Sequence, residues 1–160
     1  MKDRKYVFIV IFFIIGVLLI LIISSAFSVF SNIKDSSLTQ VIINDNIIYV
    51  EIPKTPAERL KGLGERDFLA ENQGMLFVFE QKQKPGFVMR KMKFPLDFIW
   101  INDNQIVEIT SNAPIPDSDH ELQVYYPQSE VNYVLEVNAG YSDQHNIKIG
   151  DKVDIFTDFN

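Results

Sequence analysis

The longest apolar run in the chain lies near its amino end. Residues 6–23 read YVFIVIFFIIGVLLILII and carry no charge, and the uncharged sequence continues to Phe30. At a rise of about 1.5 Å per residue, a helix over 6–23 is about 27 Å long, which is close to the thickness of the hydrocarbon layer of a bilayer. The pattern therefore predicts a transmembrane anchor at residues 6–30.

The residues before this run predict its orientation. Residues 1–5 form a short tail with only one acidic side chain, Asp3, against three basic ones: Lys2, Arg4 and Lys5. Basic residues next to a membrane span favour the cytoplasmic side. We therefore expect a cytoplasmic tail at 1–5 and an extracytoplasmic position for everything after the span.

A cleaved signal peptide is the alternative to an anchor. The small residues Ser24 and Ala26 would suit a cleavage site. The apolar part of a signal peptide usually spans about 7–15 residues, however, and this run is longer. We favour an uncleaved anchor in the cell membrane, followed by a polar linker at 31–38 and an extracytoplasmic domain at 39–160.

The pattern after residue 38 is one of short strands. Two β-branched runs around Asn44-Asp45-Asn46 predict a hairpin of 39–44 with 47–52, and the same INDN sequence at 101–104 predicts a second hairpin. The continuous apolar run GMLFVFE at 74–80 predicts a buried strand. About eight or nine short strands and one or two short helices indicate a mainly β fold, a small sandwich or partly closed barrel, preceded by one transmembrane helix.

One short helix has a clear start signal. Thr55 suits the N-cap, Pro56 suits the first helical position, and Glu58 completes a capping box. The helix should end at a glycine, with Leu60 and Leu63 facing the sheet.

Composition and charge narrow the possible chemistry. The chain has no cysteine, which excludes disulfides, thiol nucleophiles and zinc–thiolate sites. Of its 15 Lys and Arg and 21 Asp and Glu, three basic residues and one acidic residue precede residue 31, which leaves 12 and 20 and a net charge of −8 for the remainder. An acidic domain of this kind argues against nucleic acid as a partner, because that affinity depends on neutralising phosphates.

Two carboxylates are the candidates for catalysis. Asp97 stands at the start of a predicted strand, where it could accept a hydrogen bond from Arg59, Arg66 or Arg90. Glu136 lies within another strand and needs a partner if it is buried. Together, Asp97 and Glu136 would make a general acid–base couple of the kind that hydrolases use, although structural ion pairing is the commoner role of such residues.

Metal and cofactor motifs are weak in this sequence. Asp117, Asp119 and His120 lie together on a polar loop, but a metal site would need a further ligand from elsewhere, and such loops are usually solvated. There is no glycine-rich phosphate loop, nucleophile elbow or His-Glu-x-x-His sequence. We expect neither a metal nor a cofactor.

Several segments in order resemble one family. They are TPAERLKGLGER (55–66), GMLFVFE (74–80), FVMRKMKFPLDFIWI (87–101), APIP (113–116) and VNYVLEVNAG with IKIGDKV (131–153). Together they resemble the bacterial and archaeal family called domain of unknown function 192, over residues 40–157. The resemblance implies a small, mainly β domain that often follows a signal or membrane anchor. It implies no reaction.

The sequence departs from the pattern of that family at two places. Gly64 stands where the family commonly has Met, while Arg66 matches. Val88, Lys91 and Met92 stand where the family usually has Trp, Asn and Thr, so a ligand of that surface would be bound differently here.

These observations favour a non-catalytic binding or scaffolding module of the cell envelope. The expected surface joins the short helix, the segment 81–96 and the loop 111–121, and its candidate ligand-binding residues are Arg59, Arg66, Met89, Arg90 and Asp97. A peptide, a glycan or an anionic small molecule would suit its mixed polarity. The alternative is a hydrolase of an envelope polymer that uses Asp97 and Glu136.

The anchor yields the first prediction. A reporter enzyme that is active only outside the cytoplasm, fused after Asn160, should be active, and the full-length protein should sediment with membranes. Activity of a cytoplasm-specific reporter at the same position, or a freely soluble full-length protein, would contradict this topology.

Overall fold

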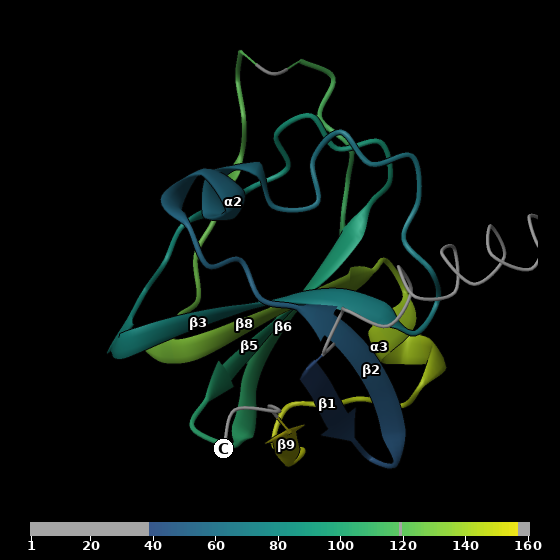
Figure 1. Ribbon diagram of the computed structural model, residues 1–160, viewed down its shortest axis with the longest axis vertical. Helices are drawn as coiled ribbons and strands as arrows, with labels where there is room; N and C mark the ends of the chain where they lie inside the picture. Colours follow the sequence, from purple (N-terminus) through teal and green to yellow (C-terminus); the bar gives the residue numbers. More distant parts are fainter. Residues whose placement is uncertain (1–38, 119, 157–160) are drawn as a thin grey trace, which may run out of the picture. The chain divides into compact units, whose positions relative to one another are not determined.

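The described part of the chain is built around one large sheet. The computed structural model describes residues 39–118 and 120–156. A seven-stranded sheet has the strand order β6-β5-β8-β3-β2-β1-β9, and β4 and β7 form a separate two-stranded sheet (Figure 1). The elements are β1 (Thr39–Ile43), β2 (Asn46–Glu51), α2 (Pro56–Lys61), β3 (Gln73–Gln83), β4 (Phe87–Val88), β5 (Leu96–Asn102), β6 (Gln105–Ala113), β7 (Val124–Tyr125), β8 (Val131–Asn138), α3 (Tyr141–Gln144) and β9 (Val153–Phe156).

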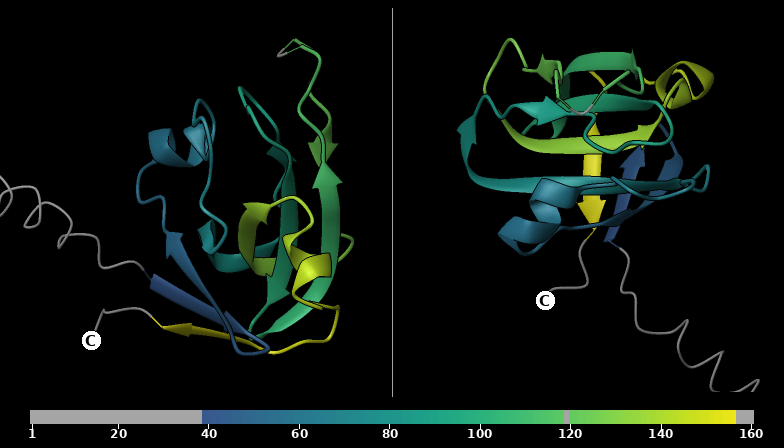
Figure 2. Two further views of the ribbon diagram at one scale, coloured as in Figure 1. Left: turned by 90° about the vertical axis from the view of Figure 1, so that its right-hand side faces the viewer. Right: turned by 90° about the horizontal axis from the view of Figure 1, so that it is seen from above.

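The large sheet is mixed and strongly curved. Strand β3 runs parallel to β2, and the other pairs in the sheet are antiparallel. In Figure 2, β1, β2 and β9 turn away from β5 and β6. Gln105, the first residue of β6, forms one isolated bridge with Lys152, the residue before β9. The mainly β prediction is confirmed, with nine strands and two short helices in the described residues, but these strands do not close into a barrel.

Both predicted hairpins are present. Strands β1 and β2 are joined at Asn44 and Asp45, whose φ angles are 49° and 66°. Strands β5 and β6 are joined through Asp103, whose φ is 56°. Asn and Asp tolerate this left-handed conformation because their short side chains bond locally, so the turn residues set the strand register.

Helix α2 begins as the sequence predicts. The Thr55 hydroxyl accepts a hydrogen bond from the Glu58 amide at 3.2 Å, and the Glu58 carboxylate accepts one from the Thr55 amide at 2.9 Å. Leu63 is buried as expected. The prediction for Leu60 is wrong: its side chain is 70% exposed, because the six-residue helix buries none of its residues.

Strand β8 runs through the middle of the sheet with apolar side chains on both of its faces. One cluster includes Leu76, Ile99, Leu135 and Val137, and a second includes Phe77, Phe98, Trp100 and Val134. Alternation along each strand assigns successive residues to opposite clusters. This division decides which polar side chains can meet.

Asp97 lies on the face of the sheet that carries the first cluster, and it joins three elements there. Its fully buried carboxylate accepts hydrogen bonds from the backbone amides of Asn112 at 2.8 Å, Gly140 at 3.0 Å and Ser142 at 3.0 Å. The side chain therefore attaches β6 and the start of α3 to β5.

The predicted membrane anchor at 6–30 lies outside the described residues, as do the tail at 1–5 and the linker at 31–38. Within 39–118 and 120–156, none of the helices has the length and apolar character that crossing a bilayer requires.

Asp97→Ala should lower the free energy of unfolding by about 3 kcal/mol or more, because it leaves three buried amides without their charged acceptor. Urea unfolding followed by circular dichroism measures this. Asp154→Ala, which removes the exposed partner of Lys152, should change stability little. Equal, small effects of the two substitutions would contradict the role assigned to Asp97.

Candidate functional site

A pocket of about 210 Å³ lies beside α2 on the second face of the sheet. Phe77, Phe87 and Leu96 give it an apolar lining, and Glu136 also lines it. Arg59, Lys61 and Arg90, which are exposed, complete its wall. The pocket thus combines an apolar interior, one carboxyl group and a basic mouth.

Packed aromatic rings hold the interior of the pocket in place. The ring of Phe87 meets that of Phe77 edge-on at a centroid distance of 4.8 Å, and that of Trp100 edge-on at 5.6 Å. Such edge-to-face pairs stabilise beyond the area they bury. Strand β4, which pairs only with β7 among the described strands, is therefore fixed to the large sheet through Phe87.

Glu136 is the unusual group in this pocket. On β8 it stands opposite Met75 of β3 and Phe98 of β5, so strand alternation directs it into the second apolar cluster. The residue is only 5% exposed, and its Oε2 atom has no hydrogen-bond partner among the described residues. Burial raises the pKa of Glu136 to about 8, against the opposing effect of the Arg66 charge. The carboxyl group is therefore mainly protonated and neutral at pH 7.

The chain turns closely past this carboxyl group at Gly62. This residue follows α2 with a φ of 53°, a conformation that favours glycine. A Cβ atom there would lie 3.8 Å from Oε2 of Glu136 and from the ring of Phe77. The glycine thus shapes the pocket next to Glu136.

Arg66 is engaged elsewhere. Its guanidinium forms two hydrogen bonds with the Glu51 carboxylate, at 2.5 and 2.8 Å. These bonds hold the pKa of Glu51 below its usual value. Arg66 does not line the pocket, and it acts on Glu136 through its charge alone. Its predicted place among the ligand-binding residues is therefore not supported by the geometry.

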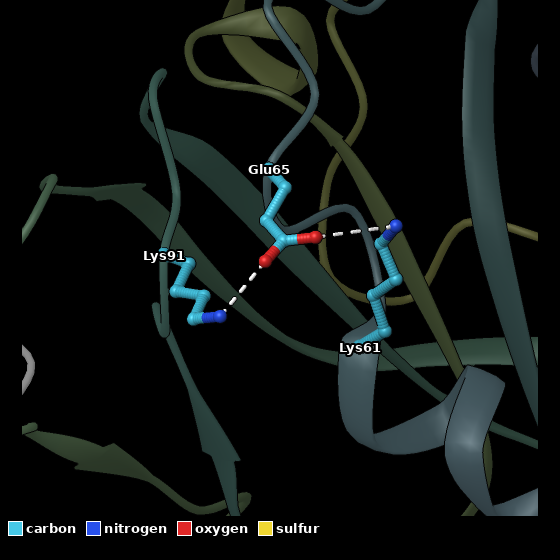
Figure 3. Close-up of polar contacts among 3 residues, drawn as sticks. All are labelled: Lys61, Glu65 and Lys91. Atoms are coloured by element: carbon cyan, nitrogen blue, oxygen red, sulfur yellow. Dashed lines mark hydrogen bonds and ion pairs between the residues drawn. The ribbon is translucent and has the colours of Figure 1, made fainter.

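The wall formed by α2 is bonded to the turn after β4. Figure 3 shows Glu65 between two lysines: its carboxylate lies 2.8 Å from Nζ of Lys91 and 3.4 Å from Nζ of Lys61. The Glu65 amide also donates to the Lys91 carbonyl at 2.9 Å. Lys91 and Lys61 hold the pKa of Glu65 below its ordinary value. This network fixes the distance between α2 and the turn after β4.

Gly64 permits this close approach. A Cβ atom at Gly64 would lie 2.9 Å from the carbonyl oxygens of both Arg90 and Lys61, closer than real Cβ atoms come. A side chain at this position would therefore push the segment containing Arg90 outward. Glycine at position 64, where the sequence departs from the family pattern, thus allows the segment containing Arg90 to lie close to the chain after α2, and this sets the position of the mouth.

The two arginines at the mouth have few partners. Among the described residues, the side chain of Arg90 has neither an ion pair nor a hydrogen bond, and the side chain of Arg59 has only a long hydrogen bond of 3.4 Å from its Nε to the Pro53 carbonyl. A second hollow, of about 360 Å³, shares Leu60, Lys61 and Arg90 with the pocket. The exposed apolar side chain of Leu60 thus lies between two openings with basic rims.

The remaining predicted site residues lie elsewhere. Met89 is 3% exposed and belongs to the second apolar cluster. Asp97 is paired in register with Val137, whereas Glu136 is paired with Phe98, so Asp97 and Glu136 point to opposite faces of the sheet. The acid–base couple of the alternative hypothesis is therefore not formed, and the bonds from arginines considered for Asp97 are replaced by bonds from backbone amides.

Sequence reasoning missed the apolar half of the pocket. Phe77, Phe79 and Phe87 were expected only as strand residues, and no short motif marks them as pocket residues. The one available signal was Glu136 itself, a carboxylate in a strand of apolar residues. Within 39–118 and 120–156, no three His, Asp or Glu side chains are grouped so as to hold a metal ion.

Sequence comparison identifies the family. The model of the family DUF192, described as an uncharacterized ACR, matches residues 39–155. The chain belongs to the DUF192 family. The resemblance of the sequence motifs to domain of unknown function 192 is thus confirmed, and the whole described domain lies within the match except for its final residue.

Two solved structures share this DUF192 fold. One is a protein of Sinorhizobium meliloti described as a candidate transcription regulator; it is 29% identical, with a TM-score of 0.64, and the match covers 73% of this chain and 91% of that one. The other is a protein of unknown function from Novosphingobium aromaticivorans, also 29% identical with a TM-score of 0.64, and the match covers 73% and 83%. No curated protein gives a significant sequence match.

The buried carboxyl group predicts a distinct dependence of stability on pH. Because the folded-state pKa of Glu136 is about 8, above its value of about 4.5 in the unfolded chain, stability should fall as the pH rises between these two values. Glu136→Gln removes this titration. The free energy of unfolding of the variant minus that of wild type should therefore be a few kcal/mol larger at pH 9 than at pH 5. Urea unfolding at both pH values measures it, and parallel pH profiles would contradict it.

Proposed function

We propose that the chain is a membrane-anchored, extracytoplasmic binding module of the cell envelope that takes a small anionic amphiphile in the pocket beside α2. The anchor is the uncharged segment 6–30. The observation that carries the proposed binding is the combination of an aromatic pocket with two guanidinium groups at its mouth, Arg59 and Arg90, neither of which pairs with a carboxylate of the described residues.

The dimensions of the pocket favour a small molecule over a peptide or a glycan. Its volume of about 210 Å³ is below the range of about 300–1,000 Å³ that is usual for drug-sized ligands. Three phenylalanine rings in the lining suit an apolar or aromatic body, whereas a glycan needs many more polar partners. A carboxylate or phosphate at the mouth would gain charge-assisted hydrogen bonds from the arginines.

Hydrolysis by a carboxylate pair is not proposed. Among the described residues that line the pocket, Glu136 is the only carboxylate, because Asp97 lies across the sheet. A lone neutral carboxyl group can orient a ligand through a hydrogen bond, but it does not supply both the acid and the base of such a mechanism. Binding therefore accounts for the pocket better than hydrolysis does.

The Sinorhizobium meliloti protein is described as a candidate transcription regulator. For this chain, regulation of transcription is less well supported than binding of a small ligand. Its net charge of −8 after residue 30 repels a phosphate backbone. Two arginines beside an apolar pocket instead suit one acidic group on a small ligand.

Titration calorimetry with 3-phenylpropionate tests the proposal on the full-length chain in lipid nanodiscs, with empty nanodiscs as the blank. Wild type should bind it, and Arg90→Ala and Arg59→Ala should each weaken binding about 5- to 10-fold, because each removes a charge from the mouth. Higher salt should weaken binding further.

Lys148→Ala is the control for this experiment. It removes one exposed positive charge that does not line the pocket, so its affinity should equal that of wild type. Equal losses in the Lys148 and Arg90 variants would contradict the proposed site, as would a wild type that binds neither 3-phenylpropionate nor its 4-hydroxyphenyl counterpart.

A further inference from the structure

Resting on the proposed function, we infer that the ligand carries a neutral hydrogen-bonding oxygen, such as a hydroxyl group, at its apolar end, and that this oxygen meets the carboxyl group of Glu136 while the acid at its other end meets Arg59 and Arg90. The ligand class is thus an acidic amphiphile with a polar group at both ends rather than a simple apolar acid.

The unpartnered carboxyl group requires this second polar end. Glu136 lines the pocket, is 5% exposed, and its Oε2 atom has no hydrogen-bond partner among the described residues. A buried polar atom without a partner costs about 1–3 kcal/mol, so native structures rarely keep one without a reason. A ligand oxygen placed there would remove this cost, whereas a purely apolar ligand would leave it.

The protonation state of Glu136 defines the chemistry of that oxygen. With a pKa of about 8, the group offers one O–H donor and one carbonyl acceptor at neutral pH. A hydroxyl group complements it fully, because it accepts from the O–H and donates to the carbonyl. A cation at this depth would meet the nearby positive charge of Arg66 and the basic residues Arg59, Lys61 and Arg90 of the same pocket, so a neutral group is favoured.

The surrounding side chains define what connects the two ends. The rings of Phe77, Phe79 and Phe87 line the same pocket as Glu136 and the basic residues at its mouth. Aromatic rings favour edge-to-face or offset contacts with another ring. A hydroxyphenyl group with a short acidic side chain therefore represents the proposed class, with the hydroxyl inward and the acid outward.

Matched ligand pairs test the inference. Phenylacetate, 3-phenylpropionate and 4-phenylbutyrate are each compared with their 4-hydroxyphenyl counterparts by calorimetry at pH 6.5, on the full-length chain in nanodiscs. For at least one chain length, the hydroxylated ligand should bind wild type about 10-fold or more tightly than its partner, because a site built to bond a hydroxyl group rejects the analogue that lacks it.

Two variants connect this preference to Glu136. Glu136→Gln keeps a donor and an acceptor and should keep most of the preference, whereas Glu136→Leu, of similar size but apolar, should abolish or reverse it. Unfolding curves confirm that both variants fold.

The outcomes separate the inference from the proposed function. Equal binding of both members of every pair to wild type, or a preference that persists in Glu136→Leu, overturns the inference and leaves the proposed binding of an anionic amphiphile intact. No binding by any of the six ligands overturns the proposed function and the inference together.

Discussion

The burial of both faces of β8 is the constraint on which the rest of the site depends. Side chains alternate along a strand, so the buried residues 134–137 of β8 point in turn toward one apolar cluster and the other. Glu136 points into the same buried face as its strand neighbours Met75 and Phe98 and is only 5% exposed. A carboxyl group in such a position is stable only in its neutral form or with a partner.

The two buried carboxyl groups of the sheet show the two solutions to this problem. Asp97 remains satisfied because three backbone amides point at it, and it is used to attach α3 to the sheet. Within the described part of the chain, no group donates such a bond to Oε2 of Glu136, and instead this residue lines a pocket beside α2. A buried carboxyl group thus holds structural elements together on one face of the sheet, whereas on the other face a buried carboxyl group keeps an oxygen without a hydrogen bond from the described residues.

Local chemistry was readable from the sequence, whereas the assignment of side chains to faces was not. The Thr55 cap and the turns at Asn44 and Asp103 depend on residues close together in the chain, and they formed as predicted. The separation of Asp97 from Glu136 depends on the register between β5 and β8, which no short pattern encodes. The basic mouth was predicted in part, through Arg59 and Arg90, but the three phenylalanines and the fit at Gly64 arise only from tertiary contacts.

The ionisation of Glu136 is the most direct test of this account. The side-chain carboxyl carbons of glutamate can be labelled with carbon-13, and the Glu136 signal can be assigned as the one that is lost in Glu136→Gln. A pH titration by nuclear magnetic resonance should then show this signal changing with a midpoint near the expected pKa of about 8. A midpoint between about 4 and 5, the ordinary range for glutamate, would mean that the pocket holds a charged carboxylate and would contradict the account.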